Sequence, residues 1–233
     1  MKTRDRLIVA IDRSSRGEIL SLADSLHGIA GLYKIGLQAF LANGSAIVHE
    51  LAGRGESVFL DLKLHDIPNT VQQAVTEIMA MKVSMLTLHT AGGSAMMRAA
   101  AREVASKGPI LLGVTVLTSL SEADLEEVGF SGTTESRVTR LARLAQQAGL
   151  RGVVASPIEI EAIREACGPQ LLIVTPGIRG RRDATGDQKR TMTARAALEA
   201  GADYIVVGRP ITEARDPRGA ALALLENAQR ARR

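Results

Sequence analysis

Two opposite charges stand two residues apart in an otherwise apolar segment. Residues 58–64 read Val-Phe-Leu-Asp-Leu-Lys-Leu, so that Asp61 and Lys63 alternate with leucines. A period of two predicts a β-strand with the leucines on one face and both charges on the other. A carboxylate and an ammonium are costly to bury unless they are paired. The ammonium can stabilise a developing negative charge and supply a proton, which are the tasks of an acid–base site.

Short apolar, β-branched segments recur along the whole chain and alternate with stretches of helical periodicity. The predicted strands are residues 7–12, 31–36, 58–64, 85–90, 110–118, 152–156, 171–175 and 204–208. The clearest predicted helices cover residues 94–106, 137–148 and 193–200. Eight strand–helix units without a linker-like change of composition predict one (β/α)8 TIM barrel, a single catalytic domain over residues 1–233. The rival, an open doubly wound sheet, usually has a glycine-rich turn after its first strand, which this sequence lacks.

Barrel active sites lie at the C-terminal ends of the strands. Several predicted strands carry polar or charged side chains there, which are poor packing material: Asp12, Lys34, Asp61, Lys63, His89, Thr118 and Ser156. The alternation that turns Asp61 and Lys63 inward also turns Asp12 and Lys34 inward. We therefore expect a Lys–Asp–Lys–Asp network in one pocket. An ion-pair network that merely closes the barrel mouth is the alternative.

Composition excludes several classes of protein. The chain has 233 residues, of which 45% are hydrophobic and 23% charged, as in ordinary globular domains. With no Trp, 2 Tyr and 3 Phe, it has few aromatic faces on which single-stranded nucleic acid could stack. The apolar runs are too short to cross a bilayer, and the N-terminus lacks a signal-peptide pattern. The lone Cys167 forms no internal disulfide, and we expect a soluble cytoplasmic protein.

The net charge of +4 is concentrated in two segments. Residues 179–190 carry +3 and residues 226–233 carry +2, which leaves −1 for the rest of the chain. This distribution fits a local anion site and a basic tail better than the broad basic face of a nucleic-acid-binding protein. We expect neither nucleic acid nor a membrane as a partner.

The segment that begins at Asp61 carries a recognisable motif. Residues 61–70 read Asp-Leu-Lys-Leu-His-Asp-Ile-Pro-Asn-Thr and resemble the Asp-x-Lys-x-x-Asp-Ile-x-x-Thr signature of the orotidine 5′-phosphate decarboxylase family, in its bacterial form. The resemblance extends along the chain through residues 33–36, 116–119, 175–179, 186–190 and 207–211. Related sugar-phosphate enzymes share Asp-x-Lys-x-x-Asp. The following Ile-Pro-Asn-Thr, with Gly-Asp-Gln and Gly-Arg-Pro later in the chain, narrows the resemblance to the orotidylate decarboxylases.

The resemblance implies an enzyme that converts orotidine 5′-phosphate to uridine 5′-phosphate and CO₂, the last step of de novo pyrimidine synthesis. It implies neither a metal nor an organic cofactor. Lys63 would stabilise the carbanion that forms at C6 of the pyrimidine and would then protonate it. Asp61 and Asp66 would balance the charge of Lys63. Lys34 would hold Asp61 and contact the ribose, whose hydroxyls Asp12 would also bind.

The loops after the seventh and eighth strands frequently bind phosphate in such barrels. Glycine and arginine stand at both places, and the resemblance implies these substrate-binding residues: Pro176, Arg179, Gly208 and Arg209. It also implies that the loop between Arg179 and Thr191 is a lid, in which Gln188 reaches both the phosphate and the base. Thr118 is expected to bind the edge of the base. Ser156 ends a strand in the same way, but a capping box already explains it.

The resemblance further implies a homodimer, in which Asp66, Ile67 and Thr70 of one subunit reach the neighbouring site. Three other functions compete with this reading. A sugar-phosphate decarboxylase or lyase of the same suprafamily would need a metal-ligand carboxylate and a different sequence after Asp66. A non-catalytic binder of a phosphate ligand would not need four converging charges. A nucleic-acid-binding protein would need a continuous basic face.

Overall fold

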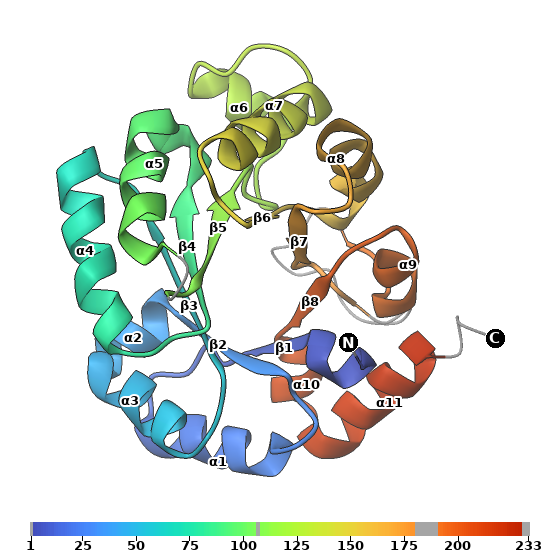
Figure 1. Ribbon diagram of the computed structural model, residues 1–233. Helices are drawn as coiled ribbons and strands as arrows, with labels where there is room; N and C mark the ends of the chain where they lie inside the picture. The colour runs from blue at the N-terminus through green and yellow to red at the C-terminus, as the bar shows by residue number, and fades with distance from the viewer. Residues whose placement is uncertain (1, 106–107, 180–190, 230–233) are drawn as a thin grey trace.

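A closed barrel of parallel strands forms the centre of the molecule, and helices surround it (Figure 1). The structure is a computed structural model that describes residues 2–105, 108–179 and 191–229. The strands are β1 (Leu7–Ala10), β2 (Leu32–Gly36), β3 (Val58–Leu64), β4 (Met85–His89), β5 (Ile110–Val114), β6 (Gly152–Val154), β7 (Leu172–Thr175) and β8 (Tyr204–Val207). Each strand pairs with its neighbours in chain order, and β8 pairs with β1. The predicted (β/α)8 barrel is confirmed.

The helices follow the strands on the outside of the barrel (Figure 1). In chain order they are η1 (Thr3–Arg6), α1 (Arg16–Leu26), α2 (Leu37–Asn43), α3 (Ser45–Gly53), α4 (Pro68–Ala80), η2 (Thr90–Gly92), α5 (Gly93–Val104), α6 (Glu122–Glu127), α7 (Thr134–Gln147), η3 (Pro157–Glu159), α8 (Ile160–Cys167), α9 (Ala194–Glu199), α10 (Arg209–Thr212) and α11 (Pro217–Gln229). Within the described part of the chain, no helix is long and apolar enough to span a membrane.

Side-chain capping explains where several helices begin. Ser15 accepts a hydrogen bond from the Glu18 N–H at the start of α1. Asp216 accepts one from the Gly219 N–H at the start of α11, where Pro217 takes the first position. Each cap satisfies a backbone donor that the first helical turn leaves without a partner, which fixes where both helices start.

Alternation along the strands divides the apolar side chains into two cores. The barrel interior is filled by buried side chains from seven strands: Ile8, Ala10, Leu32, Phe59, Met85, Leu112, Val174 and Val206. The opposite faces of the strands pack against the helices in a larger core. On β2 and β3, the inward position two residues after the apolar layer is charged, because Lys34 follows Leu32 and Asp61 follows Phe59. The apolar layer thus forms the floor of a polar cavity.

Three strands end at least two residues earlier than the sequence predicts. β1 ends at Ala10, β5 at Val114 and β6 at Val154, whereas the predicted ends were residues 12, 118 and 156. The Thr115 N–H still donates to the Val154 carbonyl, and the chain leaves the barrel wall after that bond. Asp12 and Thr118 therefore stand on the loops that follow their strands, at the mouth of the barrel.

Candidate active site

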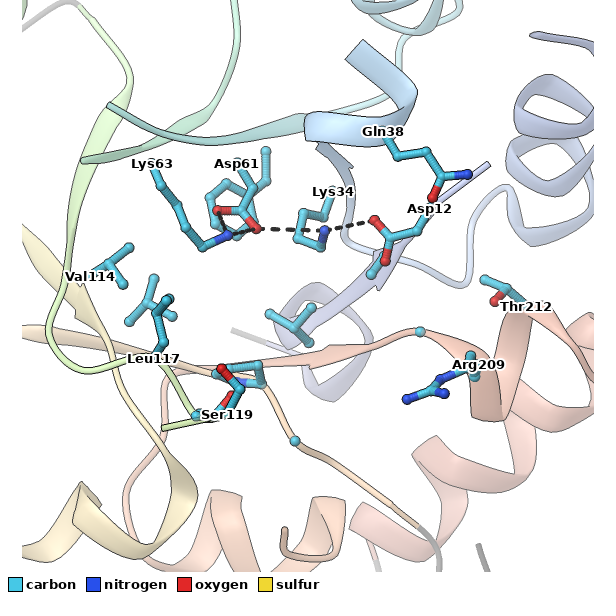
Figure 2. A pocket seen from close by; sticks show the side chains of 18 of the residues that line it. Asp12, Lys34, Gln38, Asp61, Lys63, Val114, Leu117, Ser119, Arg209 and Thr212 are labelled. Carbon is cyan, nitrogen blue, oxygen red and sulfur yellow. Dashed lines mark hydrogen bonds and ion pairs between the residues drawn. The ribbon is translucent and has the colours of Figure 1, made fainter. Parts of the chain in front are cut away.

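The C-terminal ends of the strands surround a cavity of about 690 Å³ (Figure 2). Cavities of this size are typical of small-molecule sites. The following predicted site residues line it: Asp12, Lys34, Asp61, Lys63, Thr118, Pro176, Arg179, Gly208 and Arg209. Ser156 is buried and is not among the described residues that line the cavity. Its backbone N–H donates to the Glu159 carboxylate.

Four charged side chains form a continuous row along one wall of the cavity, as the dashed lines in Figure 2 show. The Lys63 Nζ lies 2.9 and 3.0 Å from the two carboxylate oxygens of Asp61. The Lys34 Nζ lies 3.6 Å from Asp61 Oδ2 and 3.1 Å from Asp12 Oδ1. The row therefore alternates in sign from Lys63 to Asp61, Lys34 and Asp12, as strand alternation predicts.

Asp61 is the most buried member of the row, and its charge depends on its neighbours. Its side chain is 12% exposed. Burial alone would raise the pKa of this carboxyl group, but the positive charges of Lys34 and Lys63 act in the opposite direction. With hydrogen bonds from Lys63 and Thr87, they hold the pKa of Asp61 below its ordinary value. Asp61 is thus a carboxylate at neutral pH, paired with an ammonium on each side.

Sequence reasoning missed Thr87, which lies behind this row on β4. Its hydroxyl donates to Asp61 Oδ1 at 2.9 Å and accepts the backbone N–H of Lys63 at 2.9 Å. The alternation of Met85 and Thr87 along β4 does place a hydroxyl on the inward face. The sequence does not predict the register of β3 against β4, and this register brings Thr87 to the Asp61 carboxylate and the Lys63 N–H.

Sequence reasoning also missed further lining residues, all on segments that follow a strand: Arg13, Gln38, Ser119, Thr212 and Glu213. Two of them have partners outside the charged row. Gln38 donates to the Ser14 hydroxyl, and Arg13 donates to the Thr212 carbonyl. Their positions next to predicted strand ends were the available signal, because loops that follow the strands build the sites of these barrels.

The second aspartate of the motif lies away from the cavity of its own chain. Asp66 is exposed, and its carboxylate accepts the Ile67 N–H just before α4. Ile67 and Thr70 are also exposed, and none of the three is among the described residues that line the cavity. Within one chain, the charged partners of Lys63 therefore do not include Asp66.

The ends of β7 and β8 form the predicted phosphate side of the cavity. Pro176, Gly177 and Arg179 follow β7, and Gly208 and Arg209 follow β8. Figure 2 places Arg209 near the Asp12 end of the charged row, away from Lys63. Gln188 and the expected lid segment 180–190 lie outside the described residues.

A metal site is not visible in the described segments. Within residues 2–105, 108–179 and 191–229, no three His, Cys, Asp or Glu side chains are grouped to hold a metal ion. The carboxylates that do line the cavity are engaged with ammonium groups instead.

Comparison with known proteins identifies relatives of similar length. A protein named orotidine 5′-phosphate decarboxylase from Heliobacterium modesticaldum is 49% identical over 97% of this chain and 96% of its own. A second, from Moorella thermoacetica, is 49% identical over 96% of this chain and 92% of its own. The crystal structure of orotidine 5′-phosphate decarboxylase from Lactobacillus acidophilus superimposes with a TM-score of 0.84 at 34% identity, covering 95% of this chain and 98% of that one.

The family signature agrees with these relatives. The profile described as "Orotidine 5'-phosphate decarboxylase / HUMPS family" matches residues 5–224, which include every strand of the barrel and all four members of the charged row. A match over nearly the whole chain, together with relatives at this level of identity, decides the family. The chain belongs to the orotidine 5′-phosphate decarboxylase / HUMPS family.

Proposed function

We propose that this protein is a cytoplasmic carboxy-lyase that converts orotidine 5′-phosphate to uridine 5′-phosphate and CO₂. The observation that carries the proposal is the row of alternating charges inside the cavity, with Lys63 at one end and Asp12 at the other. The family supports it, because the relatives described above bear the name of this enzyme. The reaction is the last step of de novo pyrimidine synthesis.

The shape of the cavity suggests how the nucleotide lies in it. Arg209 stands near the Asp12 end of the row, so the phosphate belongs at that end, where a guanidinium can bind it through two hydrogen bonds. The ribose then lies beside Asp12 and Lys34, whose charged groups can bind its hydroxyls. The pyrimidine reaches the Lys63 end of the row, with Thr118 available to its polar edge.

The chemical step breaks the bond between C6 of the pyrimidine and its carboxylate carbon. The electron pair stays on C6, and CO₂ leaves. The Lys63 ammonium stabilises the negative charge that develops on C6 and then transfers a proton to it, which forms uridine 5′-phosphate. Lys63 becomes a neutral amine in this step and regains its proton from water. Asp61 holds the ammonium in place through two short contacts.

Repulsion between Asp61 and the substrate carboxylate can contribute, but it is too small to account for the rate. Two like charges about 4 Å apart repel by roughly 4 kcal/mol at an effective dielectric constant near 20. Enzymes lower barriers by about 8–23 kcal/mol. We therefore assign the larger share to stabilisation of the carbanion by Lys63.

We further propose that the active form is a homodimer, in which Asp66, Ile67 and Thr70 of one subunit complete the site of the other. All three are exposed in the single chain, and the side chain of Ile67 is 66% exposed although it is large and apolar. On α2, Leu41 is 80% exposed. Large apolar side chains left in solvent at these positions are suited to an interface between subunits.

The proposal is tested by following the absorbance of orotidine 5′-phosphate during incubation with purified protein and an excess of chelator. We expect the orotate band to disappear and chromatography to identify uridine 5′-phosphate. Because the chain has no Trp, its own absorbance interferes little. An unchanged spectrum, with an active control enzyme under the same conditions, would contradict the proposal. It would point instead to a sugar-phosphate lyase, which a screen of sugar-phosphate substrates with added metal and no chelator would reveal.

A further inference from the structure

Thr87 occupies an unusual position in the barrel wall. It lies on the inward face of β4, two residues after Met85, which belongs to the apolar interior. Its side chain is fully buried. Thr87 is not among the described residues that line the cavity, so it has no direct route to a bound nucleotide. Any effect that it has on the reaction must pass through the residues it contacts.

The register between β3 and β4 changes at this position. Leu60 pairs with Leu86 and Leu64 pairs with Leu88, so residues 61–63 of β3 stand opposite Thr87. The extra residues form a bulge in β3, and bulges of this kind redirect side chains next to active sites. Here the bulged segment contains both Asp61 and Lys63, the reacting end of the charged row.

The bulge places Lys63 in a strained backbone conformation. Its φ angle is +52°, in the left-handed region that side chains other than glycine rarely adopt. Such a conformation persists only where the surroundings hold it. The Lys63 N–H donates to the Thr87 hydroxyl at 2.9 Å, and Lys63 has no register partner on β2 or β4. Thr87 therefore supplies the bond that the bulge removes.

The direction of both hydrogen bonds of Thr87 follows from the chemistry of its partners. A backbone N–H can only donate, so the Thr87 oxygen accepts from Lys63. The Asp61 carboxylate can only accept, so the hydroxyl hydrogen points to Asp61 Oδ1. One buried hydroxyl thus fixes the backbone of Lys63 and the carboxylate that holds its ammonium.

We propose that Thr87 is a positioning residue for decarboxylation, which holds the ammonium of Lys63 and the carboxylate of Asp61 in their reactive arrangement. The inference rests on the proposed function. It gives a residue of β4, outside the motif that begins on β3, a role in positioning the reacting groups. Because the hydroxyl acts on the reacting end of the row, its loss should affect turnover more than binding.

The test compares variants that differ in this hydroxyl. Thr87→Val keeps the shape of the side chain and removes both hydrogen bonds, and Thr87→Ser keeps the hydroxyl. The control is Thr90→Val, because Thr90 is equally buried and its hydroxyl donates to the Val114 carbonyl without contact to the charged row. For each variant, kcat and KM for orotidine 5′-phosphate, the affinity for uridine 5′-phosphate and the melting temperature are measured.

We expect Thr87→Val to lower kcat by about 10- to 100-fold, because a buried carboxylate and a buried N–H lose a partner. KM and product affinity should change by less than about threefold, because the phosphate and ribose contacts remain. Thr87→Ser should restore most of kcat. Thr90→Val should lose stability without a comparable loss of kcat. A similar fall of kcat in Thr87→Val and Thr90→Val would overturn the proposal, since it would reduce Thr87 to a structural role.

If Thr87→Val does not fold, a second pair of variants tests the same role of the Thr87 hydroxyl. Thr87→Ala and Thr87→Ser both lack the methyl group and differ only in the hydroxyl. We expect kcat of the alanine variant to be at least about tenfold below that of the serine variant. Equal kcat values in this pair would overturn the role of Thr87. A wild-type protein without turnover would instead overturn the proposed function, and this inference with it.

Discussion

Lys63 is the only residue in the charged row whose position suits both demands of the proposed reaction. Its ammonium lies at the end of the row opposite Asp12, and Asp61 holds it through both carboxylate oxygens. Replacing Lys63 with Ala removes the stabilising charge and the proton donor together. Each role contributes about 10²- to 10⁴-fold in other enzymes. We therefore expect turnover to fall by at least about 10⁴-fold in single-turnover measurements.

The same variant should still bind the product, because uridine 5′-phosphate carries no carboxylate and keeps its phosphate and ribose contacts. Isothermal titration should give a dissociation constant within about tenfold of the wild type, equivalent to about 1.4 kcal/mol. Turnover within tenfold of the wild type would disprove the assignment of Lys63. Loss of both turnover and product binding would mean that the residue shapes the whole cavity.

At this scale, strand alternation predicted that these four charges meet, and they do, although β3 bulges between Leu60 and Leu64 and β1 ends before Asp12. Asp12, Lys34, Asp61 and Lys63 accordingly line one cavity. Alternation does not predict the φ angle of Lys63 or its bond to Thr87. Both depend on how β3 is aligned with β4, and that alignment arises only when the strands pair.

At the scale of elements, the turn after β7 shapes the side of the cavity where we propose that the phosphate binds. Gly177 has φ of +78°, in the left-handed region, and its carbonyl accepts the Met192 N–H. Gly177→Ala should lower the free energy of unfolding by about 1–2 kcal/mol, because a Cβ is disfavoured in this conformation.

Gly53→Ala in α3 is the matched control. A Cβ there meets no neighbour within 4 Å, so alanine should stabilise the helix by up to about 1 kcal/mol. Urea unfolding measures both, and changes of the same sign would contradict this account of the turn.

The boundaries of elements were less predictable than their order. The apolar run 110–118 has the composition of one long strand, yet β5 ends at Val114. A strand continues only where a neighbour offers hydrogen bonds, and β6, with three residues, ends at Val154. The length of β5 is thus limited by its partner, and composition along a single segment does not contain that information. The early end leaves Thr118 on a loop that lines the cavity.

At the scale of the whole molecule, the motif is split between two environments. Asp61 and Lys63 face the cavity of their own chain, whereas Asp66 lies outside it and its carboxylate accepts the neighbouring Ile67 N–H. A site that needs both aspartates must receive the second from another subunit. This arrangement makes each subunit of the proposed homodimer depend on the other for activity.

Mixing two inactive variants tests this dependence. Lys63→Ala lacks the ammonium, and Asp66→Ala lacks the carboxylate that the proposed partner site needs. In a mixed dimer, the Asp66→Ala subunit supplies Lys63 and the Lys63→Ala subunit supplies Asp66, so one of the two sites is intact. Random exchange should restore about a quarter of the wild-type activity. As a control, Lys63→Ala is mixed with a chain that carries both substitutions, which can form no intact site. If no activity returns once mass spectrometry shows mixed dimers, each site is complete within one chain, and Asp66 acts without crossing between subunits.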